Sequence, residues 1–207
     1  MILGYYDRVL LPHLLDCLCG LPDITAERAR LLPRAHGRVL EIGIGTGLNL
    51  RHYDARRVQH IHGVDPAAQM QTKARRRAAA IHIPVETVPL VVEQIGAADA
   101  HYDCVVCTFT LCSIPDGVSA LREMRRVLKP GGELLFCEHG RAPDASVRRW
   151  QQRLNPIWGR LAGGCQLHRD VPQLLQDGGF RVQEMQCKYL PGPRPFAYIY
   201  AGTAVAA

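Results

Sequence analysis

The segment VLEIGIGTGLNL, residues 39–50, constrains the fold most, because it places three glycines at every second position directly after an apolar run. Glycine weakens helices and strands, so Gly43, Gly45 and Gly47 indicate a turn where the backbone bends sharply or lets a ligand approach closely. The apolar residues before them predict a short buried strand over residues 38–44. This segment therefore predicts a strand that leads into a ligand-binding loop.

The rest of the chain alternates between patterns typical of strands and of helices. Helical patterns over residues 67–80 and 118–128 lie between strand patterns, and Pro130 with two glycines ends the second of them. This alternation predicts an α/β fold, with a mostly parallel sheet and helices on both faces. The stretch 141–169 is less regular. Seven strands are expected, at 38–44, 59–65, 85–92, 102–110, 132–139, 181–190 and 195–204.

Length and charge limit the classes of protein. The chain has 207 residues, 47% of them hydrophobic, which suits one domain. We expect residues 1–35 to form a helical lid region and residues 36–207 to form the sheet domain.

The net charge of +6 would suit a nucleic acid or an anionic membrane, but the arginines occur in scattered groups without interleaved aromatic residues. Solvated helix faces explain them better, and we expect no nucleic-acid partner.

The eight cysteines are expected to be reduced thiols in a cytoplasmic protein, because the first residues lack the pattern of a secretory leader. Cys104 and Cys107 form a C-x-x-C within a predicted strand, where a spacing of three sends the side chains to opposite faces. No second such pair occurs, so we expect no metal site. The sequence also has no apolar stretch of the roughly 18 residues that a membrane span requires.

The glycine spacing disfavours two common nucleotide sites. A dinucleotide fingerprint requires G-x-G-x-x-G, but here the third glycine comes one place early and Leu48 takes its slot. A phosphate-binding loop would continue with G-K-S or G-K-T, which is absent.

The pattern E-x-G-x-G-x-G after one strand, with an acid at the end of the next, instead resembles the S-adenosylmethionine site of class I methyltransferases. The segments GVD (63–65), YDCVVCTFTLCSIPD (102–116) and LREMRRVLKPGGELLFCEH (121–139) extend the resemblance, which covers residues 37–203. It implies a Rossmann-like domain with an N-terminal lid. It also implies S-adenosyl-L-methionine as cofactor and S-adenosyl-L-homocysteine as product.

The resemblance implies roles for the first loop and the acid after the second strand. The three glycines would let the methionine end of the cofactor lie close to the backbone, and a following helix would offer N–H groups to its carboxylate. Glu41 would receive hydrogen bonds from the ammonium group, directly or through water. Asp65 would accept the ribose hydroxyls, although it could also cap the helix that follows.

Other cofactor contacts are open at this stage. Where the family often has an aspartate for the adenine amine, this sequence has PLVVEQIG, which leaves backbone groups near Val92 or the side chain of Glu93. Thr108 begins a segment expected to line the methyl-transfer site. In related methyltransferases an N-terminal tyrosine reaches the cofactor carboxylate, which assigns that role to Tyr5 or Tyr6, unless this segment is a core helix.

The closer resemblance is to methyltransferase-like proteins that alkylate thiols, a branch near the ubiquinone and menaquinone methyltransferases. It rests on CTFTLCSIPD (107–116), PGGELLFCEHG (130–140) and WQQRLNPIWGRLAGGCQLHRD (150–170). It implies S-methylation of a small apolar thiol. The lid and the segment 150–165 would enclose the pocket for it, with Ile157, Trp158 and Leu161 as walls and with Cys112 and Cys165 also in the pocket. The N-terminal segment also resembles phospholipid N-methyltransferases, so a lipid amine with peripheral membrane contact stays an alternative. Another small hydrophobic metabolite and a regulatory S-adenosylmethionine-binding protein are further alternatives.

Methyl transfer is a direct displacement that depends mainly on holding the reacting groups in line. Because a thiol with a pKa of about 8.5 is mostly protonated at neutral pH, a base or cation would raise the reactive fraction. His139 follows the fifth strand and is the first candidate, with a structural histidine as the alternative; His168 is the second. A direct displacement needs no enzyme nucleophile, so Cys112, Cys137 and Cys165 are expected to be packing residues.

Overall fold

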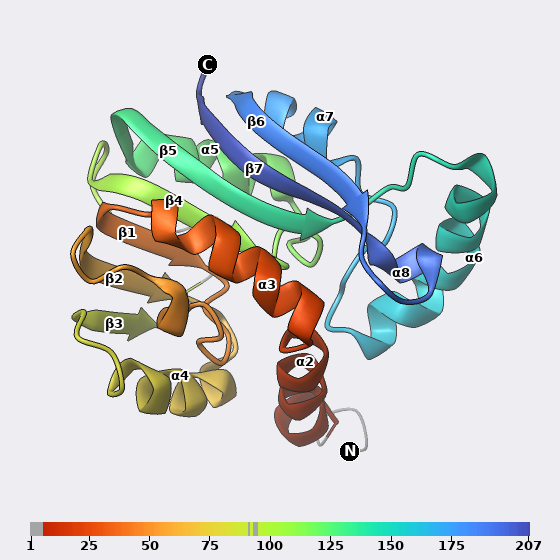
Figure 1. Cartoon of the computed structure of the whole chain (residues 1–207), viewed down its shortest axis with the longest axis horizontal. Helices are drawn as coiled ribbons and strands as arrows, with labels where there is room; N and C mark the ends of the chain where they lie inside the picture. Colours follow the sequence, from red (N-terminus) through yellow and green to blue (C-terminus); the bar gives the residue numbers. More distant parts are fainter. Residues whose placement is uncertain (1–5, 91, 93–94) are drawn as a thin grey trace.

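The structure is a computed structural model that describes residues 6–90, 92 and 95–207, so the predictions for Tyr5 and Glu93 lie outside the described residues. Its centre is a seven-stranded sheet in the order β3-β2-β1-β4-β5-β7-β6, parallel except for β7 (Figure 1). The predicted α/β fold is confirmed. The strands are β1 (Gly37–Ile42), β2 (Val58–Val64), β3 (Val85–Val88), β4 (Tyr102–Thr108), β5 (Leu128–His139), β6 (Phe180–Tyr189) and β7 (Tyr198–Ala206).

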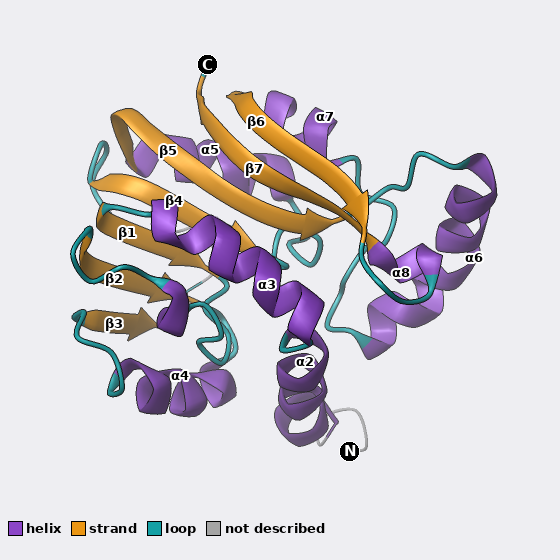
Figure 2. Ribbon diagram, in the orientation of Figure 1, coloured by secondary structure: helices purple, strands orange, loops and turns teal. Residues whose placement is uncertain are grey.

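Helices lie on both faces of the sheet. In Figure 2, α3 crosses the front face, while α5 and α7 lie behind it. The helices are α2 (Leu11–Cys19), α3 (Pro22–Leu31), α4 (Gln71–Ala78), α5 (Gly117–Val127), α6 (Ala145–Leu161), α7 (Val171–Asp177) and α8 (Arg194–Ala197). Shorter turns are η1 (Tyr6–Leu10), which is π-helical, and the 3₁₀ turns η2 (Leu32–Arg34), η3 (Leu50–His52) and η4 (Ala68–Met70).

Two apolar cores, one on each face, hold these layers together. Leu121 and Met124 of α5 are fully buried in one core, whereas Leu31 and Leu32 near the end of α3 lie in the other. The C-x-x-C pair divides between them as its spacing predicts. Cys107 lies in the α5 core and Cys104 in the α3 core.

The strand order reverses between β1 and β4, and this position defines where a ligand can bind. The two strands are parallel and in register, with Ile42 opposite Cys107. The chain leaves β1 and β4 at the same edge of the sheet and continues in opposite directions. Such a switch point opens a crevice at the carboxyl ends of the strands.

A buried carboxylate at the end of β5 orders the loop after β4. Glu138 is fully buried, and its Oε1 accepts hydrogen bonds from the backbone N–H groups of Thr110 (2.9 Å) and Leu111 (3.0 Å). Its Oε2 accepts a third from Cys112 at 3.4 Å. Burial raises the pKa of Glu138 to about 7. Since these amides have their partner inside the protein, the loop is held against the sheet rather than open to water.

Two expectations about helices were wrong. The glycine loop is followed by turns and η3 rather than by a long helix, so no regular helix N-terminus points back at it. The stretch expected to be irregular contains the 17-residue helix α6, which runs through Pro156. Tertiary contacts outweigh the proline here, because the buried Gln151 donates to the carbonyls of Gly140 (3.0 Å) and Pro195 (3.1 Å).

The described part of the N-terminal region is helical, and its role as a lid stays a prediction. It consists of η1, α2 and α3, with Gly20 and Leu21 between the two α-helices. Pro12 lies in the first turn of α2, where a proline is tolerated because the first N–H groups have no helical partner. It therefore begins a helix instead of breaking one.

Candidate cofactor and substrate site

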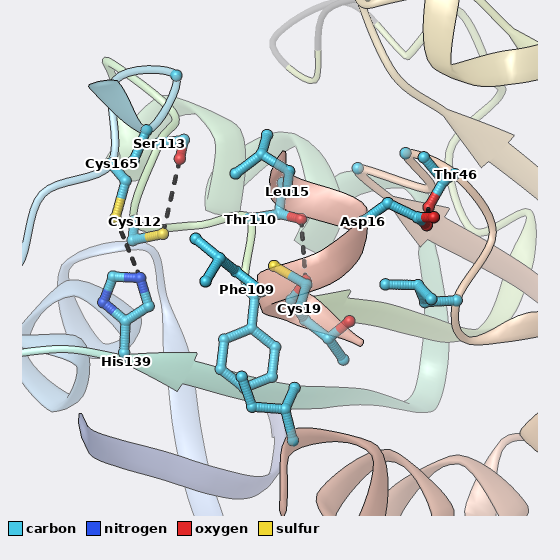
Figure 3. Close-up of a pocket in the computed structure, with 18 of the residues that line it drawn as sticks. Leu15, Asp16, Cys19, Thr46, Phe109, Thr110, Cys112, Ser113, His139 and Cys165 are labelled. Atoms are coloured by element: carbon cyan, nitrogen blue, oxygen red, sulfur yellow. Dashed lines mark hydrogen bonds between the residues drawn. The ribbon is translucent and has the colours of Figure 1, made fainter. Parts of the chain in front are cut away.

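A cavity of about 750 Å³ opens at the switch point. Its walls come from α2, α3, the glycine loop, the ends of β2, β4 and β5, the end of α6 and residues 190–197. Figure 3 shows Asp16 and Thr46 on one side of this pocket and His139, Cys112 and Cys165 on the other. The volume lies in the range of small-molecule sites.

The glycine loop makes the sharp turn that its sequence predicts, and its backbone is left-handed at the three glycines. Gly43, Gly45 and Gly47 have φ angles of +66°, +52° and +80°. A Cβ on Gly45 would make only ordinary van der Waals contacts, the nearest at 3.8 Å, whereas one on Gly43 would overlap the side chain of Thr110. Gly47 is not among the residues that line the cavity in the described structure. A Cβ there would meet Ala74 of α4 at 3.1 Å, so Gly47 serves helix packing rather than ligand approach.

Asp65, directly after β2, ties the glycine loop to the following turn. Its Oδ2 accepts a hydrogen bond from the N–H of Gly45 (2.9 Å), and its Oδ1 accepts one from Ala67 (2.8 Å). The carboxyl group is buried and lines the cavity. Burial raises its pKa, while the two amides oppose that shift. Asp65 thus orders the loop and the turn but caps no helix, because the N-cap of η4 is Ala67 and has no side-chain cap. Its contact with ribose stays a prediction.

Glu41, in β1, is buried in a polar cluster next to the loop. It accepts hydrogen bonds from Tyr53 Oη (2.8 Å) and Asn49 Nδ2 (3.0 Å). Asn49 also donates to Thr108 Oγ1 (3.0 Å), which links β1 to the end of β4. Burial raises the pKa of Glu41 to about 7, because the two donors compensate only part of the lost hydration.

Helix α2 is fastened to the glycine loop by one carboxylate. Asp16 accepts hydrogen bonds from Thr46 Oγ1 (2.5 Å) and Arg77 Nη1 (2.8 Å), and it pairs with Lys73 at 3.2 Å. Arg77 also donates to the carbonyl of Thr46 at 2.7 Å. Partial burial opposes the shift, but these donors hold the pKa of Asp16 well below its usual range. A charged network therefore holds α2 against the glycine loop.

The remaining predicted cofactor residues are not all in the cavity. Val92 and Thr108 line it, although Val92 belongs to a stretch with undescribed neighbours. Tyr6 is not among its described lining residues, and its hydroxyl donates to the carbonyl of Leu161 (2.5 Å) at the end of α6. His168 is exposed and lies outside the described lining as well. The structure does not bring His168 to the place where a base would act.

Three predicted substrate-side residues do meet. The donor atoms of Cys112, His139 and Cys165 all lie within 4.8 Å of one another, and the three side chains point toward each other in Figure 3. His139 Nε2 lies 3.0 Å from Cys165 Sγ, and Trp158 Nε1 donates to the same sulfur at 3.2 Å. All four residues line the cavity, whereas Ile157 and Leu161, also predicted as pocket walls, are exposed and are not among its described lining residues.

This arrangement perturbs the thiols in opposite directions. A hydrogen bond from Cys165 and the nearby imidazole of His139 lower the pKa of Cys112 well below its ordinary value, despite burial. The hydrogen bond to Cys112 and burial raise the pKa of Cys165. The packing role expected for Cys112 and Cys165 was therefore incomplete, since both sulfurs have polar partners. Cys137, by contrast, is a fully buried core residue.

Arg28 of α3 is a site residue that the sequence reasoning missed. It is buried and lines the cavity, and its guanidinium carbon lies 5.0 Å from the centre of the Phe109 ring. Within the described part of the chain its Nε and Nη1 atoms have no hydrogen-bond partner. The sequence did contain a signal for this position. Arg28 precedes the apolar Leu31 and Leu32 by three and four residues, a spacing that places all three on the same, inward face of a helix.

Comparisons with known proteins agree with this geometry. A family model described as a methyltransferase domain matches residues 40–136. Rat thiol S-methyltransferase TMT1B is 33% identical over 159 residues, covering 75% of this chain and 64% of the relative. Human thiol S-methyltransferase TMT1A is 32% identical over 173 residues, covering 79% and 69%. A solved structure from Thermotoga maritima, described as an S-adenosylmethionine-dependent methyltransferase and possible histamine N-methyltransferase, matches with a TM-score of 0.67. It has 19% identity and covers 99% of each chain.

Fold, glycine loop and relatives together define a class I methyltransferase that uses S-adenosyl-L-methionine and releases S-adenosyl-L-homocysteine. The chain spans about two thirds of the length of the two relatives named above. Within that class, the chain belongs to the family of the thiol S-methyltransferases TMT1A and TMT1B.

The geometry of the glycine loop predicts different effects for substitutions at Gly43 and Gly45. Gly43 is needed for the shape of the loop, and Gly45 leaves space for the ligand. Gly43→Ala should lower the free energy of unfolding most, because backbone strain of about 1–2 kcal/mol adds to the overlap with Thr110. Gly45→Ala should lower the free energy of unfolding only by the backbone strain. It should raise the Kd for S-adenosylmethionine at least roughly tenfold, since its methyl group enters the cavity. Urea unfolding and calorimetric titration measure the two effects.

Gly131→Ala is the matched control for the glycine variants, because Gly131 has a φ of +79° and open space around it. It should lose as much stability as Gly45→Ala with an unchanged cofactor Kd. Equal loss of affinity in both variants would contradict the assignment of Gly45 to the ligand side.

The buried Glu41 predicts a dependence of stability on pH. The folded protein keeps the Glu41 proton to about pH 7, whereas the unfolded chain loses it near its ordinary pKa. Between these values the folded state binds more protons, so stability contributed by this group falls as pH rises. Glu41→Gln should therefore gain about 2 kcal/mol relative to wild type between about pH 5 and pH 7.5 in the cofactor-free protein. Urea unfolding at both pH values measures the change, and a constant difference would show that the Glu41 pKa is ordinary.

Proposed function

We propose that the protein S-methylates a small apolar thiol by direct in-line displacement. One observation carries the proposal: the His139 imidazole and the glycine loop line the same largely apolar cavity. Such a cavity suits a small hydrophobic acceptor better than a polymer. The names of the relatives, thiol S-methyltransferases TMT1A and TMT1B, support the same acceptor class.

We assign the cofactor to the side of the cavity formed by the glycine loop. Asp65 would accept the ribose hydroxyls, and Glu41 would receive the ammonium group directly or through water. Arg28 would pair with the carboxylate of the methionine moiety, because a buried guanidinium with unpartnered N–H groups is most stable beside an anion. The sulfonium methyl group would then face the remaining volume of the cavity.

The displacement joins the thiol sulfur to the methyl carbon. As this bond forms, the bond between the methyl carbon and the sulfonium sulfur breaks, and its electron pair stays on S-adenosylhomocysteine. The acceptor gives up its proton, and a thiolate attacks far faster than a thiol. His139 lies on the cavity wall to assist this ionisation, while apolar side chains exclude water.

A lipid amine is the second candidate, favoured by the surface of α6. This helix carries four arginines and no acidic residue, and its Trp150, Ile157 and Leu161 are 54%, 63% and 49% exposed. Basic helices with exposed apolar side chains suit an anionic membrane surface. Among the described helices, none has the length and apolar character needed to span a bilayer. Peripheral membrane contact and a cytoplasmic location stay predictions.

The test of the acceptor is methyl transfer from labelled S-adenosylmethionine to small apolar thiols, phosphatidylethanolamine vesicles and a quinone precursor, with products identified by mass. We expect methyl thioethers as the main products. His139→Asn should lower turnover at least roughly 100-fold with an unchanged cofactor Kd. Methylation confined to the vesicles would replace this proposal with the lipid amine.

The Arg28 assignment predicts a selective loss of affinity. Arg28→Met should raise the Kd for S-adenosylmethionine roughly 10- to 100-fold, as expected for a lost charged hydrogen bond, but leave decarboxylated S-adenosylmethionine almost unaffected. Asp65→Ala should weaken both ligands at least tenfold, because they share the ribose. Arg30→Met, on the same helix but with its side chain 42% exposed, is the control. Equal weakening of both ligands by Arg28→Met would rule out the carboxylate contact.

A further inference from the structure

We propose that Cys112, His139 and Cys165 bind one zinc ion, and that the acceptor thiol occupies its fourth coordination position. The inference deepens the proposed function and rests on it for the identity of the fourth ligand. The three side chains come from the loop after β4, the end of β5 and the segment after α6, so only the folded chain brings them together.

The spacing of the donor atoms fits a tetrahedral ion. Zinc binds thiolate sulfur at about 2.3 Å and imidazole nitrogen at about 2.0–2.1 Å, which sets neighbouring ligand atoms roughly 3.4–3.8 Å apart. The three donors of this cluster lie within 4.8 Å of one another, with His139 Nε2 and Cys165 Sγ at 3.0 Å. Small side-chain rotations would therefore bring all three to bonding distance. Two thiolates and an imidazole are also a ligand set that suits zinc.

The surroundings of the two sulfurs are compatible with a bound metal ion. Cys112 and Cys165 are buried and pack with Ala162 and Trp158, so ionised sulfurs there need a compensating positive charge. A divalent cation supplies that charge for both thiolates. Trp158 Nε1 donates to Cys165 Sγ at 3.2 Å, and Ser113 Oγ lies 3.6 Å from Cys112 Sγ. Polar contacts of this kind orient metal ligands in zinc sites.

The open position of such a site would face the substrate. All three residues line the cavity that also contains the glycine loop, and three protein ligands with one free position are typical of catalytic zinc. An acceptor thiol that binds there loses its proton to solvent, because the ion stabilises the thiolate. His139 then assists ionisation as a ligand of the ion.

The reaction balances without any further reactant. The bound thiolate attacks the methyl carbon, the carbon–sulfonium bond breaks, and the electron pair leaves with S-adenosylhomocysteine. The product is a neutral thioether, a weaker ligand than a thiolate, so it leaves the ion and water or a new thiol replaces it. The net change is thiol plus S-adenosylmethionine giving thioether, S-adenosylhomocysteine and one proton.

The test is metal binding by the full chain, kept reduced and freed of metal by a chelator. We expect one Zn²⁺ per chain in a competition titration against a chromophoric chelator. Co²⁺ in its place should give the visible bands of a tetrahedral site and a sulfur-to-cobalt charge-transfer band. Adding a small thiol to the Co²⁺ protein should shift these bands, because it becomes the fourth ligand.

Variants identify the ligands independently of activity. Cys112→Ser, His139→Asn and Cys165→Ser should each raise the Kd for Zn²⁺ more than the roughly 10- to 100-fold typical of changes outside the ligand set. Cys187→Ser, on the exposed face of β6, is the matched control and should bind Zn²⁺ as wild type does. Circular dichroism checks that each variant folds, and the Co²⁺ spectrum of wild type needs no variant.

The outcomes separate this inference from the proposed function. Thiol methylation that persists at full rate in protein without bound metal would overturn the zinc site and keep the S-methyltransferase. Stoichiometric Zn²⁺ binding by these three residues without thiol methylation would keep the site and overturn the acceptor. A disulfide between Cys112 and Cys165 whose reduction yields no Zn²⁺ binding would overturn the inference.

Discussion

The parallel, in-register pairing of β1 with β4 is the constraint on which the site depends. Because Ile42 lies opposite Cys107, the glycine loop and the loop after β4 begin at the same edge of the sheet and diverge there. Gly43 packs so closely on Thr110 that the two loops share one surface. The cavity follows from this divergence, since the hydrogen-bonded strands that form its base cannot spread to fill the crevice.

Buried carboxylates then give the two loops their shape. Asp65 accepts hydrogen bonds from one amide of the glycine loop and one amide of the turn after β2. Glu138 accepts hydrogen bonds from three amides of the loop after β4. Glu41 lies near the first loop, where it meets Asn49 and Tyr53. Burial of these acids is unfavourable, as the raised pKa values of Glu41 and Glu138 show, but each has hydrogen-bond donors fixed by the fold. The rigidity of the site thus rests on polar groups that are already satisfied before a ligand enters.

Local patterns predicted the fold well, and they predicted the turn at the glycine loop. The alternation of strands and helices and the left-handed glycines depend on neighbouring residues, which the sequence displays directly. The failures have a different origin. Helix α6 continues through Pro156 because Gln151 is anchored to the sheet and α8 regions, and Gly47 faces Ala74 of a helix more than twenty residues away. His168 was the second candidate base, but its side chain is exposed to solvent.

The sequence by itself determined the class of fold, the glycine loop and the acid that follows β2, because each is encoded in a short contiguous pattern. Only the tertiary structure decided that Arg28 enters the cavity, where its Nε and Nη1 atoms have no hydrogen-bond partner among the described residues, and that Cys112, His139 and Cys165 meet there. These last three residues are separated by 27 and 26 positions, so they form no short motif that could be recognised in the sequence. The order of the parallel strands and the return of the chain after α6 place them together, and that proximity is a property of packing rather than of local sequence.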